Sequence, residues 1–146
     1  MGGAWIMLTL DKMLKESPPN WLANSDDCRI QKYKKIIDAE DKNPTVLAIA
    51  YSIFTPDGKR KENPTLHRCY IKGLDGKQKK IISSNIECSC DCEAFMYWSE
   101  VALNDKKAAL ILFSNGQDPV EKNPKKIPFG CKHIIRLGLL IQTMGM

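Results

Sequence analysis

The sequence lacks the features that mark secreted and membrane-bound chains. No apolar run approaches the roughly 20 residues that a membrane-spanning helix needs, and residues 1–17 have no basic segment ahead of their short apolar run, as a signal peptide would. Asn43 and Asn63 begin glycosylation-like triplets, but each is followed by proline, which excludes N-glycosylation. We therefore expect no membrane partner and a reducing intracellular compartment.

Internal repeats, low-complexity segments and a strong charge bias are absent as well. The 146 residues suffice for one domain whose core needs no disulfide framework. The 22 Lys and Arg residues exceed the 17 Asp and Glu residues, which gives a net charge of +5. This excess is too small to indicate a nucleic-acid-binding protein by itself, and a solvated surface accounts for it equally well.

Histidine is scarce, with two residues, whereas the six cysteines are numerous and unevenly spread. Three of them alternate with other residues in the stretch CSCDCEAF (88–95), and the stretch FGCKHII (129–135) brings a fourth together with a histidine. In a reducing compartment, clustered cysteines bind metals or catalyse reactions more often than they form disulfides. The two stretches are therefore candidates for a single metal site.

The spacing of these residues suits a tetrahedral zinc site. Residues two apart on a strand share a face, so a C-x-C pair at a strand end presents two thiolates to one point. A C-x-H pair at a helix start needs its cysteine ahead of the first turn, with Gly130 permitting the bend. Nitrogen and sulfur donors together favour zinc over an iron–sulfur cluster. The expected ligands of this one structural zinc ion are Cys90, Cys92, Cys131 and His133, with Cys88 as an alternative to Cys92.

Other interpretations of these residues remain open. A disulfide between Cys90 and Cys92 would close a very small, strained ring. A catalytic pair would join a cysteine to one of the two histidines, but no third orienting group or oxyanion signature accompanies either. Packing alone would make the cysteines inert buried thiols. His67 and Cys69 are expected to form a half-buried strand pair, since further ligands for a second metal site are lacking.

Hydrophobic periodicity predicts an α+β fold, in which a small antiparallel sheet, with a hairpin leading into the zinc site, is packed with helices. Ile30, Tyr33 and Ile37 recur at helical spacing behind Ser25, a residue type that caps helices. Helices are expected over residues 8–16, 25–40, 93–104 and 132–143, and strands over 45–54, 65–73 and 79–90. Residues 108–116 are a further strand candidate, and 116–130 are expected to form a loop. These elements divide into an N-terminal helical segment (1–44) and a region of sheet and zinc site (45–146), which form one compact domain.

The cysteine pattern resembles the SWIM-type zinc finger family. The stretch CDCEAF supplies Cys90, Cys92 and a phenylalanine at Phe95, and GCKHII supplies Cys131, His133 and the start of an apolar helix. The resemblance covers residues 65–143. The 38 residues between the two pairs exceed the interval of compact SWIM modules, and this longer layout is similar to that of small SWIM-like proteins of tailed bacteriophages.

The resemblance implies binding to DNA or to other proteins. No open metal position or activated nucleophile is visible, so we expect a protein that is not an enzyme. A zinc-stabilised structural or assembly component of a bacteriophage particle, made of several subunits and found in the host cytoplasm or the virion, is the first hypothesis. The alternative is a SWIM-type DNA-binding accessory protein that contacts the DNA backbone through Lys125, Lys126, Lys132 and Arg136.

Overall fold

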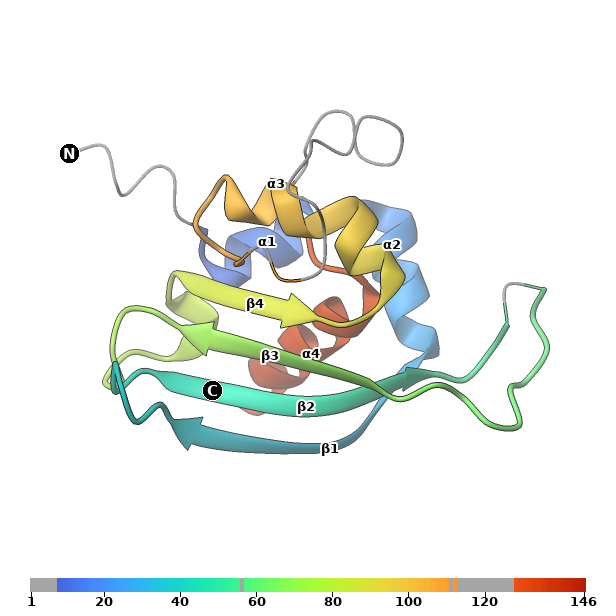
Figure 1. Ribbon diagram of the computed structural model, residues 1–146, viewed down its shortest axis with the longest axis horizontal. Coiled ribbons are helices and arrows are strands. Elements are labelled where there is room, and N and C mark those ends of the chain that lie inside the picture. The colour runs from blue at the N-terminus through green and yellow to red at the C-terminus, as the bar shows by residue number, and fades with distance from the viewer. Residues whose placement is uncertain (1–7, 56, 111, 113–127) are drawn as a thin grey trace.

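A four-stranded antiparallel sheet forms the centre of the molecule. The computed structural model describes residues 8–55, 57–110, 112 and 128–146. Its strands lie in the order β1–β2–β3–β4, so that each pairs with its neighbour in sequence (Figure 1). They are β1 (Cys28–Ile37), β2 (Pro44–Ser52), β3 (His67–Gly73) and β4 (Ile86–Cys90).

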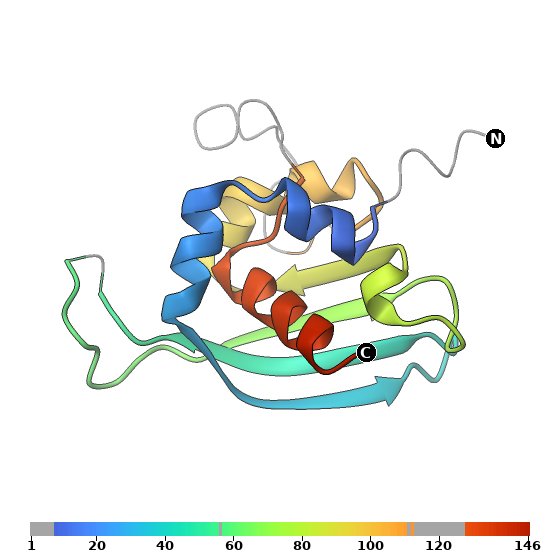
Figure 2. The same ribbon diagram turned by 180° about the vertical axis from the view of Figure 1, so that it is seen from behind.

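Helices cover one face of this sheet and confirm the expected α+β class. The helix α4 (Lys132–Thr143) lies across the sheet, with α1 (Leu10–Glu16) and α2 (Pro19–Asn24) beside it (Figure 2). The remaining helical elements are the short turns η2 (Ser25–Asp27) and η3 (Ile81–Ser83), the π-helical η4 (Phe95–Ser99) and α3 (Glu100–Asn104). Among the described helices, none has the length and apolar character that crossing a bilayer requires. The opposite face of β1, β2 and β3 carries no described helix (Figure 1).

The helix predicted over residues 25–40 is wrong, because the chain there forms β1, the edge strand of the sheet. Ile30 lies opposite Ala50 and Tyr33 lies opposite Ala48, but a bulge between Ile30 and Lys32 adds one residue to β1. The bulge therefore places Ile30 and Tyr33 on one side of the strand with a spacing of three. That spacing imitates a helix. The part of the expected N-terminal helical segment (1–44) that forms β1 is thus sheet.

Most other elements lie where the sequence predicts them. The strands expected over 45–54 and 65–73 correspond to β2 and β3, and the helices expected over 8–16, 93–104 and 132–143 contain α1, then η4 with α3, and α4. The strand expected over 79–90 begins only at Ile86, because the residues before it form the turn η3. Residues 108–110 and 112 form no strand, and the rest of the expected strand and most of the expected loop over 116–130 lie outside the described residues.

The core fills the space between the sheet and α4. Every second residue of β2 is buried on this side, namely Val46, Ala48 and Ala50. On α4 the buried positions recur at helical spacing, among them Ile134, Leu137 and Ile141. Burial of such side chains contributes roughly 1.5–3 kcal/mol each to folding. The small alanines of β2 leave room for the helix.

Gly130 lets the chain approach α4 closely as it enters that helix. A Cβ atom added at Gly130 would lie 2.4 Å from Cγ2 of Ile134, and Ile134 itself is fully buried. The φ angle of Gly130 is not positive, so glycine is needed for space and not for a left-handed turn. Any larger residue must displace either the helix or the entering chain.

We therefore predict that Gly130→Ala lowers stability by about 1–3 kcal/mol, the usual cost of overpacking a core. Ile134→Ala alone is also destabilising, because it leaves a cavity. The Gly130→Ala/Ile134→Ala double variant should be more stable than the sum of the two single losses predicts, since the nearer clashing atom, Cγ2, is gone and only the Cβ of residue 134 stays close. Urea unfolding of the four proteins measures this coupling, and strict additivity would contradict it.

Candidate metal centre

Four buried donors meet beneath the sheet, at the end of β4 and the start of α4. The sulfurs of Cys90, Cys92 and Cys131 and a ring nitrogen of His133 all lie within 4.8 Å of one another. Each of the four side chains is at most 6% exposed. The described residues contain no second group of three or more His, Cys, Asp or Glu side chains with this closeness. The four predicted ligands are thus together and can hold a metal ion.

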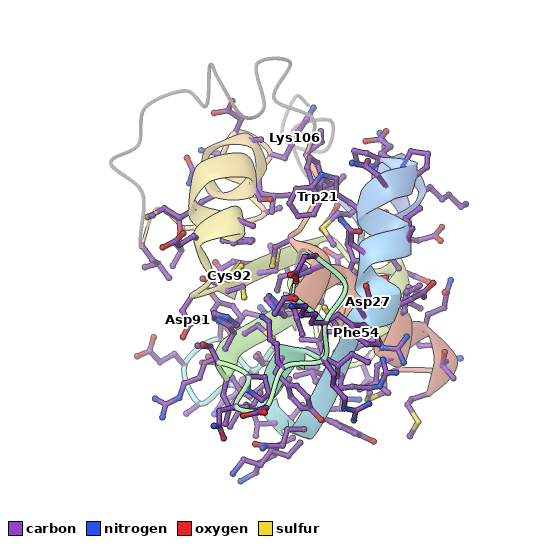
Figure 3. The ribbon with its side chains drawn as sticks, turned by 90° about the vertical axis from the view of Figure 1, so that its right-hand side faces the viewer. Trp21, Asp27, Phe54, Asp91, Cys92 and Lys106 are labelled. Atoms are coloured by element: carbon purple, nitrogen blue, oxygen red, sulfur yellow. The ribbon has the colours of Figure 1, made fainter. Side chains whose placement is uncertain are left out.

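Cys90 and Cys92 are positioned by the junction between a strand and a helix. Cys90 is the last residue of β4 and lies opposite Cys69 of β3. Cys92 immediately precedes the helical residues 93–104, and its Sγ accepts the backbone N–H of Phe95 at 3.3 Å. In most helices a side-chain oxygen of the N-cap residue accepts the N–H of the third helical residue, and here the Cys92 sulfur takes that place. In Figure 3, Cys92 lies where the sheet edge meets this helix, with Asp91 beside it at the surface.

Cys131 and His133 are positioned by the first turn of α4. Cys131 is the N-cap residue with extended φ and ψ of −66° and 172°, and its carbonyl oxygen accepts the N–H of Ile135 at 2.9 Å. His133 follows in the first turn. Its Nδ1 lies 3.8 Å from Sγ of Cys90 and 3.9 Å from Sγ of Cys131. The imidazole therefore points Nδ1, and not Nε2, at the sulfurs.

The electrostatics of the site favour a bound cation between sulfur anions. Cys92 and Cys131 each occupy the residue before a helix, where the exposed N–H groups and the helix dipole stabilise negative charge. Hydrogen bonds donated chiefly by the thiol of Cys131 lower the pKa of Cys90. Burial raises the pKa of Cys131, so this sulfur stays protonated unless a positive charge arrives. Metal binding must therefore release protons, and acidic conditions weaken it.

The opposite nitrogen of His133 is oriented by β2. Nε2 of His133 lies 3.4 Å from Oγ of Ser52, the last residue of that strand, and both side chains are buried. Ser52 in turn lies 3.8 Å from Sγ of Cys28, the residue opposite it on β1. When Nε2 carries the proton and donates to Ser52, Nδ1 is left free to bind a metal. Partners of this kind fix the ring and the tautomer of a metal-binding histidine.

His67 lies against the His133 ring, a role that was not predicted from the sequence. The two ring centres are 4.7 Å apart, and Nδ1 of His67 lies 3.0 Å from Oδ1 of Asp91. Asp91 stands between two donors of the cluster, so it ties His67 to the same short segment. As expected, His67 is half-buried and Cys69 is buried on β3. The position of Asp91 between Cys90 and Cys92, in a chain with only two histidines, could have predicted that His67 lies near the centre.

The other cysteines lie outside the four-donor group. Cys88 is fully buried on β4 opposite Ile71, two residue pairs along the strand from Cys90, and burial raises its pKa. The alternative ligand set with Cys88 in place of Cys92 is therefore not the one that the fold brings together. All six cysteines lie in the described part of the chain, and all are free thiols.

The predicted DNA-contacting residues are only partly described. Lys132 and Arg136 are half-buried on α4, on the helical side of the sheet. Lys125 and Lys126 lie outside the described residues. A contact between these four residues and DNA stays a prediction.

No known protein helps to interpret this centre. No protein-family model matches the chain, and neither the curated proteins nor the solved structures contain a match. The resemblance of the cysteine pattern to SWIM-type fingers therefore stays an interpretation of the sequence, and the donor geometry carries the argument.

Separate substitutions of Cys92 and Cys88 test which cysteines bind the metal. Cys92→Ser should lose the bound metal and lower the melting temperature, because one donor of four is removed. Cys88→Ala should retain one metal ion per chain, since Cys88 lies outside the group, although its cavity costs some stability. Metal content of the purified proteins, measured by mass spectrometry, separates the two. If Cys88→Ala lost the metal and Cys92→Ser retained it, Cys88 and not Cys92 would be the ligand.

Removal of the Ser52 hydroxyl tests the orientation of His133. Ser52→Ala should weaken metal affinity by roughly 10–100-fold while one ion still binds, because the Nε2 partner is lost and the four donors remain. Thr45→Val is the matched control, since Thr45 is also buried on β2 and its hydroxyl has no hydrogen-bond partner among the described residues. Competition with a chromophoric chelator measures both affinities. Equal values for Ser52→Ala and wild type would show that the hydroxyl does not support the ring.

Proposed function

We propose that the four donors hold one zinc ion. Zinc bonds of about 2.3 Å to sulfur and 2.0 Å to nitrogen, in a tetrahedron, place sulfur and nitrogen about 3.5 Å apart. The distances from Nδ1 of His133 to the sulfurs of Cys90 and Cys131 are 3.8 and 3.9 Å, so a small contraction around the ion completes the site. Three sulfurs with one imidazole form a common structural zinc set, and harder ions prefer oxygen.

The zinc ion has a structural role in this proposal, and the protein is not an enzyme. Protein donors fill the four positions that tetrahedral zinc offers, and all four are buried. A catalytic zinc ion instead keeps one position open for water or substrate. This completeness of the donor set is the single observation that carries the proposal.

The ion would fasten the end of the sheet to the main helix. Cys90 belongs to β4, Cys92 begins the helical segment 93–104, and the other two donors begin α4. The α4 side chains cover the sheet, so an ion that fixes the first turn of α4 also fixes the core. Free energy of zinc binding then becomes free energy of folding.

A structural or assembly role is the function that we infer for the clamped domain. The described residues between β2 and β3, 53–55 and 57–66, extend away from the body as an arm (Figures 1 and 2). Leu66 on this arm is 46% exposed, and a recess of about 480 Å³ at the arm's base is lined by Tyr51, Ile53 and Leu66 among others. An arm and a recess on one molecule allow head-to-tail contact between subunits.

The resemblance of the cysteine layout to small SWIM-like proteins of tailed bacteriophages supports a place in a phage particle. The partners would be other protein subunits, in the host cytoplasm or in the virion. The free thiols suit a reducing environment, which also keeps zinc ligands available.

DNA binding is the second candidate, and the arm's tip favours it. Lys59 and Arg60 are exposed there, and Lys61 follows them. A protruding basic segment can contact the phosphate backbone of DNA without reading its sequence. Binding of this kind weakens steeply as salt rises.

Sedimentation of a pair of variants tests the assembly role. Leu66→Asp should shift the zinc-loaded protein from oligomer to monomer, because it places a charge on the arm where a neighbour would pack. Leu47→Asp is the control, since Leu47 is similarly exposed at 42% but lies on the sheet. Both variants should keep one zinc ion per chain.

A wild-type protein that is monomeric at all concentrations would contradict the assembly role. So would loss of the oligomer in Leu47→Asp with retention in Leu66→Asp. Zinc content is measured on the same samples, so a failure of the metal site is recognised separately.

A further inference from the structure

The face of the sheet that no described helix covers carries two parallel rows of side chains. One row crosses the strands as Lys34, Leu47, Tyr70 and Ser89, which are directly opposite one another in the strand register. The next row runs through Lys32, Ile49 and Arg68. Figure 1 looks on to this face. Apolar side chains thus lie at the centre, and cations lie on the strands around them.

These rows line a groove of about 840 Å³. Its floor includes Leu47, Ile49 and Tyr70, of which Leu47 is 42% exposed. Beyond β4 the groove reaches Asp91 and Leu112. An exposed apolar floor of this extent on a sheet indicates a surface that another molecule covers.

The charges around the groove favour a negatively charged occupant. Lys32, Lys34 and Arg68 form no ion pair with the described residues. Two carboxylates beside the groove hydrogen-bond to other groups. Glu87 accepts the hydroxyl of Tyr70 at 2.8 Å, and Asp91 lies 3.0 Å from Nδ1 of His67. Three cations are therefore available to a ligand, and the hydrogen bond to Glu87 fixes the Tyr70 ring.

We propose that this face binds single-stranded nucleic acid. Unpaired bases expose flat apolar surfaces that can lie on Tyr70, Leu47 and Ile49, while the phosphates meet the lysines and the arginine. Open sheets and grooves that combine aromatic and cationic side chains bind single strands in this way. A duplex fits less well, because its bases are already stacked and paired. They could not contact the apolar side chains of the floor, which would stay exposed to water.

Competing occupants match the face less closely. A further β-strand would have to pair along the free edge of β1, where Lys32, Lys34 and Lys35 oppose such pairing. A second copy of this chain would bring the same cations face to face, which is unfavourable. The inference rests neither on the metal nor on the assembly role, because the groove lies on the opposite side of the sheet from α4.

The first experiment compares nucleic acids. A fluorescent oligothymidine and a duplex of equal length are titrated with zinc-loaded full-length protein, at low and at physiological salt. The single strand should bind at least tenfold more tightly than the duplex, and its affinity should fall steeply with salt. Equal or tighter duplex binding, or no single-strand binding at low salt, would overturn the proposal.

Two sets of variants then locate the contact. The triple variant Lys32→Ala/Lys34→Ala/Arg68→Ala should weaken single-strand binding by more than tenfold and flatten its salt dependence by about 0.7 in logarithmic slope per cation removed. The control, Lys12→Ala/Lys15→Ala/Lys79→Ala, removes the same net charge from residues that are already paired with acids, and should bind as wild type. Equal losses of single-strand affinity in the two triple variants would show that only net charge matters, and would refute the site.

Tyr70 provides a test that does not change charge. Tyr70→Leu should weaken binding by roughly tenfold, because base stacking on an aromatic ring is lost. Tyr70→Phe keeps the ring but loses the hydrogen bond to Glu87 that orients it, so it should bind less tightly than wild type and clearly more tightly than Tyr70→Leu. Zinc content and melting temperature verify that each variant is folded. The assignment would be wrong if Tyr70→Leu bound the oligonucleotide as tightly as wild type does. It would also be wrong if an acidic peptide bound this face more tightly and displaced the oligonucleotide.

Discussion

Three sulfurs and an imidazole buried at one point constrain the rest of this molecule. Without a cation some of these thiols stay protonated, because buried sulfurs that crowd one another cannot all ionise. With a dication the same residues join the end of β4, the helix that starts after Cys92 and the first turn of α4. The core between α4 and the sheet is therefore assembled around the ligands.

Residues outside the four-donor group pack around the centre. Ser52 and Cys28 support His133 from β2 and β1, and His67 lies against its ring from β3. Each strand of the sheet thus contributes to the centre, either as a ligand or as a support. Because Cys92 is at once a candidate ligand and a helix cap, loss of a bound metal and fraying of residues 93–104 should accompany each other.

The sequence predicted the residues whose chemistry restricts them to a few roles. It was less informative about residues whose role depends on how the elements pack. Cys90, Cys92, Cys131 and His133 could be predicted as a group because few other roles suit two such pairs. The choice between Cys88 and Cys92 needed the fold, since alternation alone places Cys88 and Cys90 on one face of a strand. Ser52 could not be predicted as a support, because nothing in a serine at the end of a strand identifies a histidine that lies 81 residues further along the chain. The groove on the open face escaped prediction because its lysines belong to a strand that reads as a helix.

The bulge in β1 decides which side chains of this strand face the helices and which face away from them. Cys28 and Ile30 lie opposite Ser52 and Ala50, on the covered face, whereas Lys32 and Lys34 lie opposite Ile49 and Leu47, on the open one. In an unbroken strand these four alternate residues would share a face, and the lysines would point toward the core. A single inserted residue thus exchanges the two sides of half a strand while leaving the other half in place. The bulge thus keeps Lys32 and Lys34 on the open face while Cys28 and Ile30 stay on the covered one.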